Sequence, residues 1–371
     1  MKLAHKTLAE FTYAVPKVRR GYAGQTLYVN IAAGHIEARR VTDEMKRIFT
    51  GGKGFGLWRL WHAVTPQTKW NDPENELVIA SGPIGGTILY PGAGKSLVVG
   101  ISPLTGIVVD SNVGGYFGPL LKFAGWDALE IQGKAARDVI LFIAGETGRV
   151  TIEAAPLEGV DTYPLTEQLT AMYARDEADR RNVSVISAGI GSAHTRIGCL
   201  NVSWYDPKRG VARIKQAGRG GLGTVLRDKK IKAIVVRYPG MRADSNDPAD
   251  IKRIRKVGQR INKEIVELDN EQNRMRRVGT AHLVEIMDDY DLLPVHNFRF
   301  GSHPDTPKIN SKVWDALFTQ THPDSCIYGC TMACSKGVDR YTVRTGPYAG
   351  HVVTVDGPEY ETVAGCGSNI G

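Results

Sequence analysis

The chain has 371 residues, of which 42% are hydrophobic and 23% are charged. This composition is typical of a globular protein with enough length for two or three domains. No apolar run reaches the roughly 18 residues of a membrane span, and the N-terminus lacks the apolar core of a signal peptide. The net charge of +8 comes from scattered basic residues, which argues against nucleic acid and favours a phosphate-bearing cofactor or an acidic protein partner. A well-solvated surface is the plainer alternative.

Residues 22–240 show the pattern of a β-rich region with short helices. Residues 1–21 form a basic extension, and residues 26–41 alternate around Gly34 as a hairpin does. Short helices are expected at 43–49 and 56–64, on either side of the glycines at 51–56. A longer helix is expected over 165–181. Apolar runs predict strands at 76–81, 96–102, 106–111, 128–133, 139–145, 149–155 and 231–237.

A Pro-, Gly- and Asp-rich segment, 238–250, marks a change to helical periodicity. We therefore expect three parts: the basic extension 1–21, a β-rich domain over 22–240, and a mostly helical domain over 241–371. Because strands and helices do not alternate regularly, the fold class is α+β.

Three of the five cysteines lie within nine residues, at Cys326, Cys330 and Cys334. On an unbroken helix the outer two would be about 12 Å apart, so we expect the segment to fold back on itself, helped by Gly329. Three thiolates from one loop are typical of an iron–sulfur cluster. Zinc with His322 as an added ligand is an alternative, and three buried thiols are another. So few cysteines make no disulfide framework, which favours a reducing, cytoplasmic compartment.

Two glycine-rich stretches carry basic residues that suit an anion. The stretch "YPGAGKSLVVG" ends in Gly-Lys-Ser, but it lacks the first P-loop glycine and a strand follows the serine, so it is no P-loop. Lys95 remains a candidate anion contact. In "AGRGGLG", Arg219 stands between glycines that bring backbone N–H groups close to a ligand. Each stretch is equally compatible with an exposed turn, and "GGKGFG" at 51–56 matches no dinucleotide fingerprint.

The stretch "VDGPEYET" follows the cysteine loop by about 25 residues and is rich in carboxylates. A carboxylate beside a tyrosine, here Glu361 and Tyr360, suits proton transfer near a redox centre. An acidic helix N-terminus would have the same composition.

Together these stretches resemble the aldehyde:ferredoxin oxidoreductase family, tungsten enzymes with a bis-pterin cofactor and a [4Fe-4S] cluster. The resemblance starts near Gly21 and runs to the last residue. It rests on the order and approximate spacing of "GYAGQTLYVNIAAGHIE", "ASGPIGGT", "SPLTG", "SNVGGYFGPLLKFAGWDALEIQGKA", "AGRGGLGTVLRDKKIKAIVV", "VGTAHLVEIMDDYDLLPVHNF", the cysteine loop and "GPEYET".

The resemblance implies roles for the candidate residues. Cys326, Cys330 and Cys334 match three cluster ligands, and Glu361, preceded by Tyr360, matches a carboxylate proposed to transfer protons beside the metal. Lys95 stands where the family commonly has an arginine on the pterin, and a lysine lacks the bidentate fork. Asn112, Gly114, Arg219 and Gly220 match the family's residues that contact the pterin phosphates and their bridging Mg²⁺.

Two departures from the family pattern are visible. The family usually spaces its cysteines C-x2-C-x3-C, whereas here the first gap is one residue longer. The chain also ends at Gly371, while the family continues through further pterin motifs, the fourth cluster cysteine and a catalytic histidine. Cys366 does not match a family ligand, and Cys199 lies in a predicted strand. We therefore expect a fragment, or a second polypeptide that supplies the fourth ligand.

The implied activity is two-electron oxidation of an aldehyde to a carboxylic acid by a tungsten- or molybdenum-pterin, with electrons leaving through a [4Fe-4S] cluster to ferredoxin. One alternative is a family branch that reduces an aromatic acyl-CoA or another low-potential substrate. The other is an iron–sulfur fragment or electron-transfer subunit without a pterin.

Overall fold

The computed structural model describes residues 6–155, 162–272, 274–296, 298–347 and 349–357. Contacts between residues divide the chain into two units. The first unit comprises Met1–Ile88 and Ala93–Ile254, and the second comprises Leu89–Gly92 and Arg255–Gly371. Both units combine helices with sheets, which confirms the α+β fold class.

A six-stranded sheet in the first unit is built around buried, apolar central strands. Strands β2 and β7 are parallel and the other neighbours are antiparallel. The expected hairpin around Gly34 is present as β2 and β3. In sheet order the strands are β3 (His35–Arg40), β2 (Gln25–Asn30), β7 (Ala128–Gln132), β4 (Leu77–Ala80), β5 (Ser96–Ile101) and β6 (Val108–Val113).

A seven-stranded sheet forms the rest of the first unit's core. Its parallel pair is β8 and β13, and all its other pairs are antiparallel. Strand β13 is buried on both faces, so its sequence is a nearly continuous apolar run. That run is the pattern from which the strand is predicted. In sheet order the strands are β1 (Thr7–Thr12), β9 (Arg149–Ala154), β8 (Val139–Ala144), β13 (Ile231–Arg237), β10 (Val183–Ser187), β11 (Leu200–Asp206) and β12 (Val211–Ala217).

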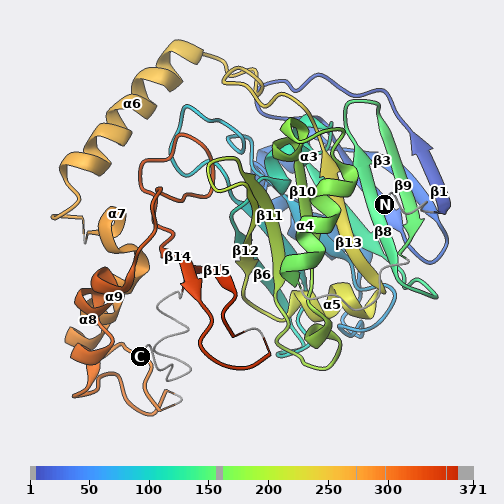
Figure 1. Ribbon diagram of the computed structural model, residues 1–371. Helices are drawn as coiled ribbons and strands as arrows, with labels where there is room; N and C mark the ends of the chain where they lie inside the picture. The colour runs from blue at the N-terminus through green and yellow to red at the C-terminus, as the bar shows by residue number, and fades with distance from the viewer. Residues whose placement is uncertain (1–5, 156–161, 273, 297, 348, 358–371) are drawn as a thin grey trace. The chain divides into compact units, whose positions relative to one another are not determined.

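Helices cover both sheets of the first unit (Figure 1). Leu60 of α2 packs on Val78 and Val99 of the six-stranded sheet, and α4 packs on the seven-stranded sheet through Leu165 and Leu169. The helices are α1 (Asp43–Phe49), α2 (Lys53–Ala63), α3 (Phe117–Phe123), α4 (Thr162–Tyr173) and α5 (Leu222–Asp228), with 3-10 turns at Ala178–Asn182 and Ile190–Ala193.

The prediction of a single helix over 165–181 is wrong at the C-terminal end. Helix α4 stops at Tyr173, and a separate 3-10 turn begins at Ala178. The carboxylate of Asp179 accepts hydrogen bonds from the backbone and side chain of Arg175, and the Asp176 carboxylate accepts the Asp179 N–H. These local side-chain bonds replace the helical ones and turn the chain.

The segment expected as a linker is tied into the first unit at Asn246, which is only 4% exposed. Its side-chain amide donates to the Gly85 carbonyl at 2.8 Å and to Thr87 Oγ1 at 2.7 Å. Its own carbonyl accepts the Gly21 N–H at 2.8 Å. The first unit therefore extends past this segment, to Ile254.

The second unit consists of short helices and a hairpin, apart from one long helix that begins just before it. No helix in the described part of the chain is both long and apolar enough to cross a bilayer. The elements are α6 (Ile251–Glu267), α7 (Met275–Val278), α8 (Leu283–Asp289), α9 (Ser311–Leu317), β14 (Gly337–Thr342) and β15 (Val352–Asp356), with 3-10 turns at Gly279–His282 and Thr306–Lys308.

Candidate functional site

Most of the predicted anion-binding residues gather around β6, the edge strand of the six-stranded sheet. Asn112 lies on β6 opposite Leu97 of β5, and both Asn112 and Lys95 are exposed. Lys95 immediately precedes β5, so strand pairing brings it to the end of β6 that carries Asn112 and Gly114. Residues 17 positions apart in the sequence thus meet through an antiparallel pairing.

The turn that carries Arg219 lies against the same strand. The Arg219 N–H donates to Ser111 Oγ at 3.1 Å. Gly220 has φ +70°, and a Cβ atom on it would lie 2.5 Å from Cγ1 of Val109. Only glycine allows this close approach, while the Arg219 side chain remains exposed. Lys95, Asn112, Arg219 and Gly220 therefore all lie at β6, where the turn contacts the side chains of Val109 and Ser111 while Asn112 leaves the strand on the other face.

One neighbouring charge was missed by the sequence analysis. Lys53, the lysine of the "GGKGFG" stretch, pairs with Asp110 of β6 through a 2.7 Å contact between Nζ and Oδ1. Asp110 lies two residues before Asn112, so the two side chains leave the strand on the same face. Lys53 reaches this strand only because α2 packs on the sheet. No local sequence pattern predicts that contact.

A buried lysine holds the backbone that precedes Lys95. Lys122 is fully buried, and its Nζ donates to the carbonyls of Gly82 (2.6 Å), Pro83 (3.1 Å) and Gly85 (2.9 Å). Its fourth acceptor is Oδ1 of Asn246 at 3.3 Å. Burial lowers the pKa of Lys122, and the nearby charge of Asp127 opposes that effect. The sequence shows this lysine only as one polar residue on an apolar helix.

The cysteine loop of the second unit folds back on itself, as its spacing requires. Asp324 and Ser335 form an antiparallel bridge across the loop, and Gly329 provides φ +81° at the turn. The thiol of Cys330 hydrogen-bonds with that of Cys326, which lowers the pKa of Cys330 to about 6. Burial opposes this change, whereas backbone N–H groups of Met332, Gly92 and Ala333 assist it.

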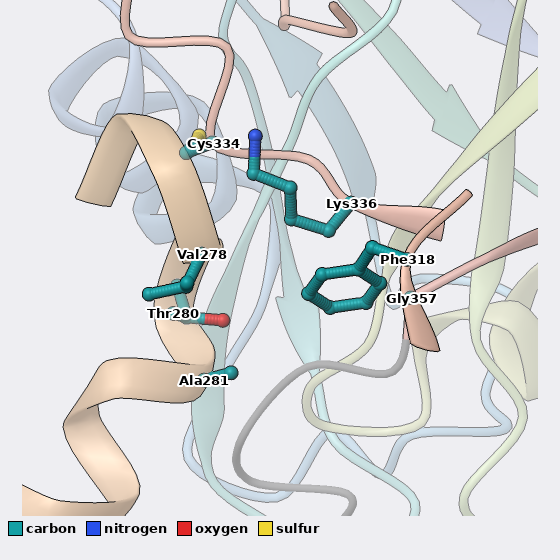
Figure 2. A pocket seen from close by; sticks show the side chains of 7 residues that line it. All are labelled: Val278, Thr280, Ala281, Phe318, Cys334, Lys336 and Gly357. Atoms are coloured by element: carbon teal, nitrogen blue, oxygen red, sulfur yellow. The ribbon is translucent and has the colours of Figure 1, made fainter. Parts of the chain in front are cut away.

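Cys334, the third cysteine of the loop, is exposed. It lines a small hollow with Lys336 (Figure 2), whose ammonium donates to the carbonyls of Arg276 (2.7 Å) and Ala333 (2.8 Å). The remaining lining residues are Val278, Thr280, Ala281, Phe318 and Gly357. The charge of Cys334 favours the ammonium form of Lys336, although burial is the larger effect and lowers the lysine's pKa.

The three cysteines do not yet form a closed set of ligands. Among the described residues, no group of three His, Cys, Asp or Glu side chains is arranged to hold a metal ion, and this includes the set with His322. The chemistry of the Cys326–Cys330 pair still fits a cluster, because backbone N–H groups directed at a thiolate sulfur are a common feature of iron–sulfur sites.

The predicted catalytic residues Tyr360 and Glu361 lie outside the described residues, as does Cys366. The last described segment is β15 with Gly357, whose N–H donates to the Lys336 carbonyl at 2.8 Å. Cys199, expected within a strand, lies one residue before β11 and is half-buried.

Comparison with known sequences decides the family. The sequence model for "Aldehyde ferredoxin oxidoreductase, N-terminal domain" matches residues 26–238, and that for "domains 2 & 3" of the same family matches residues 256–371. The chain belongs to the aldehyde ferredoxin oxidoreductase family. The first match covers the β6 edge and the second covers the cysteine loop.

The curated relatives include tungsten-containing aldehyde ferredoxin oxidoreductases. The enzyme of Pyrococcus abyssi is 30% identical over 352 residues, which are 95% of this chain and 53% of that protein. A Pyrococcus furiosus protein, "Aliphatic sulfonate oxidoreductase, WOR-like subunit", is 27% identical over 94% of this chain and 54% of its own length. The chain thus spans about half the length of the curated relatives it matches.

Among solved structures, "Active site complex BamBC of Benzoyl Coenzyme A reductase in complex with 1,5 Dienoyl-CoA" shares the fold. Its TM-score is 0.67 with 21% identity, and the match covers 94% of this chain and 51% of that one. At this identity the likeness establishes the fold alone.

Proposed function

We propose that this chain provides the cofactor-binding edge and the cysteine loop of a tungsten- or molybdenum-pterin oxidoreductase that oxidises an aldehyde to a carboxylic acid. The observation that carries the proposal is the gathering of Lys95, Asn112, Arg219 and Gly220 around β6, in a chain of this family. When bound, the metal–pterin supplies the two-electron redox chemistry, and the protein positions it.

In this proposal the β6 edge binds the phosphates of the pterin and their bridging Mg²⁺. Arg219 offers a planar fork of donors to phosphate oxygens, whereas Lys95 acts as a point charge. Asn112 offers an amide oxygen, Gly114 lets the ligand approach the backbone, and Gly220 holds the Arg219 turn against Val109. These residues bind and orient the cofactor and take no part in the redox step itself.

Cys326, Cys330 and Cys334 are the proposed ligands of a [4Fe-4S] cluster, with the fourth ligand outside this sequence. A longer chain or a second polypeptide would supply it. The proposed electron acceptor is a ferredoxin or a similar carrier. Glu361 would transfer a proton at the metal, and Tyr360 would hydrogen-bond beside it.

The first experiment compares two glycines of one turn. We expect Gly220→Ala to lose most of its bound pterin, because the added methyl group meets Val109 and the φ of +70° disfavours alanine. The matched control is Gly218→Ala, whose Cβ meets nothing within 4 Å. Pterin, iron, tungsten and molybdenum are measured in anaerobically purified protein. Equal pterin retention in the two variants would contradict the proposed cofactor edge.

The role of Glu361 has its own test. We expect Glu361→Gln to abolish aldehyde oxidation while iron and tungsten contents stay at wild-type levels, since the amide keeps the shape but transfers no proton. Activity is followed with a viologen dye as acceptor. Turnover within a few-fold of wild type would remove Glu361 from the proton-transfer role.

The fold shared with the benzoyl-CoA reductase complex supports a second candidate activity, namely reduction of an aromatic acyl-CoA. Assaying aldehydes against benzoyl-CoA with the same preparation separates the two. A preparation that holds iron but neither tungsten nor molybdenum would instead favour an electron-transfer role without a pterin.

A further inference from the structure

Helix α6 carries an excess of positive charge on its solvent side. Its sequence contains six basic and two acidic residues. Lys252 and Lys256 are exposed and pair with no carboxylate in the described part of the chain. One and two turns further on, Arg260 and Lys263 are also largely exposed, and each pairs only weakly with a glutamate on the same helix, at 3.5 and 3.6 Å.

The position of this charge within the helix is unfavourable for stability. Lys252 and Lys256 occupy the first two turns, which contain no acidic residue, although the Asp250 carboxylate just before the helix accepts the Arg253 N–H at 2.8 Å. The N-terminal end of a helix dipole is positive, so cations there raise the free energy of the folded state. Lys252 therefore gains no stability from the helix dipole, and its exposed charge is available to a partner.

The opposite side of the helix is occupied by the second unit itself. Gly258 packs so closely on the Leu89 carbonyl that a side chain would clash with it. Ile265 is buried, and Val257 and Ile261 are half-buried. A helix that lies on a membrane needs its apolar side free for lipid. Here the apolar side faces protein, and only the basic face is available to a partner.

The same helix is joined directly to the cysteine loop. Oδ1 of Asn262 accepts the Thr331 N–H at 3.1 Å and the Thr331 hydroxyl at 2.7 Å. Thr331 is the residue after Cys330, so the inner side of α6 contacts the loop that carries the proposed cluster ligands, while its outer side carries the basic residues. A carrier bound to that outer side would be separated from the cysteine loop by one helix.

From these observations we propose that the basic face of α6, formed by Lys252, Lys256, Arg260 and Lys263, is the docking surface for an acidic redox protein. Complementary charge fixes the orientation of such a partner and accelerates its association. The inference rests on the proposed function only for its physiological meaning, since binding through α6 can be measured without turnover.

The test reverses two charges and measures binding of the full-length protein to a purified acidic ferredoxin. We expect Lys252→Glu combined with Lys256→Glu to weaken the affinity at least tenfold at low ionic strength and to flatten its salt dependence. Folding is preserved in this variant because glutamate suits the N-terminal turns of a helix. The matched control is Lys308→Glu with Lys312→Glu, two exposed lysines of the second unit that give the same change in net charge.

The outcomes separate this inference from the proposed function. Unchanged ferredoxin affinity in the α6 variant, or an equal loss in the control, would overturn the docking surface. So would α6-dependent binding to anionic phospholipid vesicles or duplex DNA with ferredoxin binding unaffected. If the wild type oxidises no aldehyde with a viologen dye but its ferredoxin binding still falls on charge reversal, the docking surface stands and the proposed activity fails.

Discussion

At the scale of single residues, Lys122 illustrates how the first unit accommodates a buried charge. Three carbonyl oxygens and one amide oxygen converge on its ammonium group. A protonated amine offers three N–H donors, one more than the neutral amine, and shares them among these four acceptors. Removing one partner of such a buried set leaves polar groups without hydrogen bonds, which is more costly than the bonds are worth individually. Lys122 therefore fixes the 82–85 backbone that leads to the cofactor edge.

Glu76 presents the opposite case. It is fully buried, and neither carboxylate oxygen has a hydrogen-bond partner in the described part of the chain. Burial raises the pKa of Glu76 to about 8, and the charge of Glu130 raises it further, against the opposing charges of Arg39, Arg59 and Lys229. The folded protein therefore prefers the neutral acid.

The raised pKa predicts a stability that falls with pH. Between pH 4.5, the ordinary pKa, and about 8 the folded state binds more protons at Glu76 than the unfolded state does, so the free energy of unfolding decreases as pH rises. Glu76→Gln removes this dependence and should gain on the order of 3 kcal/mol over wild type at pH 8. Urea denaturation at pH 5, 6.5 and 8 measures the difference. Parallel pH profiles for the two proteins would contradict it.

At the scale of elements, apolar runs identify the buried strands well and helix boundaries less well. The run 231–237 coincides with β13 because burial on both faces leaves a continuous apolar signal. The sequence predicts helices on either side of the glycines at 51–56, yet α2 begins at Lys53 and includes Gly54 and Gly56. Glycine disfavours helices, but here it lets α2 approach Phe49 and Val99. Such tertiary contacts leave no local pattern.

Gly258 in α6 gives an element-scale prediction. Alanine is the better helix former by about 1 kcal/mol, yet we expect Gly258→Ala to lower the stability of the second unit. Its methyl group would clash with the Leu89 carbonyl, and overpacking of this kind costs roughly 1–3 kcal/mol. Thermal unfolding measures the change.

The neighbouring residue supplies the control for that prediction. Gln259 is exposed on the same helix, so Gln259→Ala should keep the wild-type midpoint or raise it slightly. If Gly258→Ala proves as stable as Gln259→Ala, the close packing of α6 on Leu89 is wrong.

At the scale of the whole molecule, the predictability of the site depends on how far apart its parts lie in the sequence. The cysteines are local, so their clustering and the need for a folded-back loop are visible directly. Lys95, Asn112 and Arg219 span 125 positions of the sequence and meet only through strand pairing and one turn. Their assignment to one site came from the family resemblance and not from residue spacing. Neither route identified Lys53 or Lys122 as a neighbour of this region.

The hydrophobic core is divided unequally between the two units. Among the described residues, 60 buried hydrophobic side chains belong to the first unit and eight to the second. Because apolar burial is the main source of folding free energy, the second unit should open at lower cost than the sheets of the first. Ligand binding stabilises only the states that bind it, so a cluster held by the cysteine loop would stabilise the second unit selectively.

Hydrogen exchange followed by mass spectrometry tests this asymmetry. In iron-free protein we expect the amides of β10 and β13 to exchange slowest and those of residues 324–337 to exchange at least tenfold faster. Anaerobic reconstitution with iron and sulfide should slow exchange in 324–337 and leave β10 and β13 unchanged, because metal binding free energy is delivered to the segment that folds around it. Equal protection of the two regions in iron-free protein would show that the second unit does not depend on the cluster for its stability.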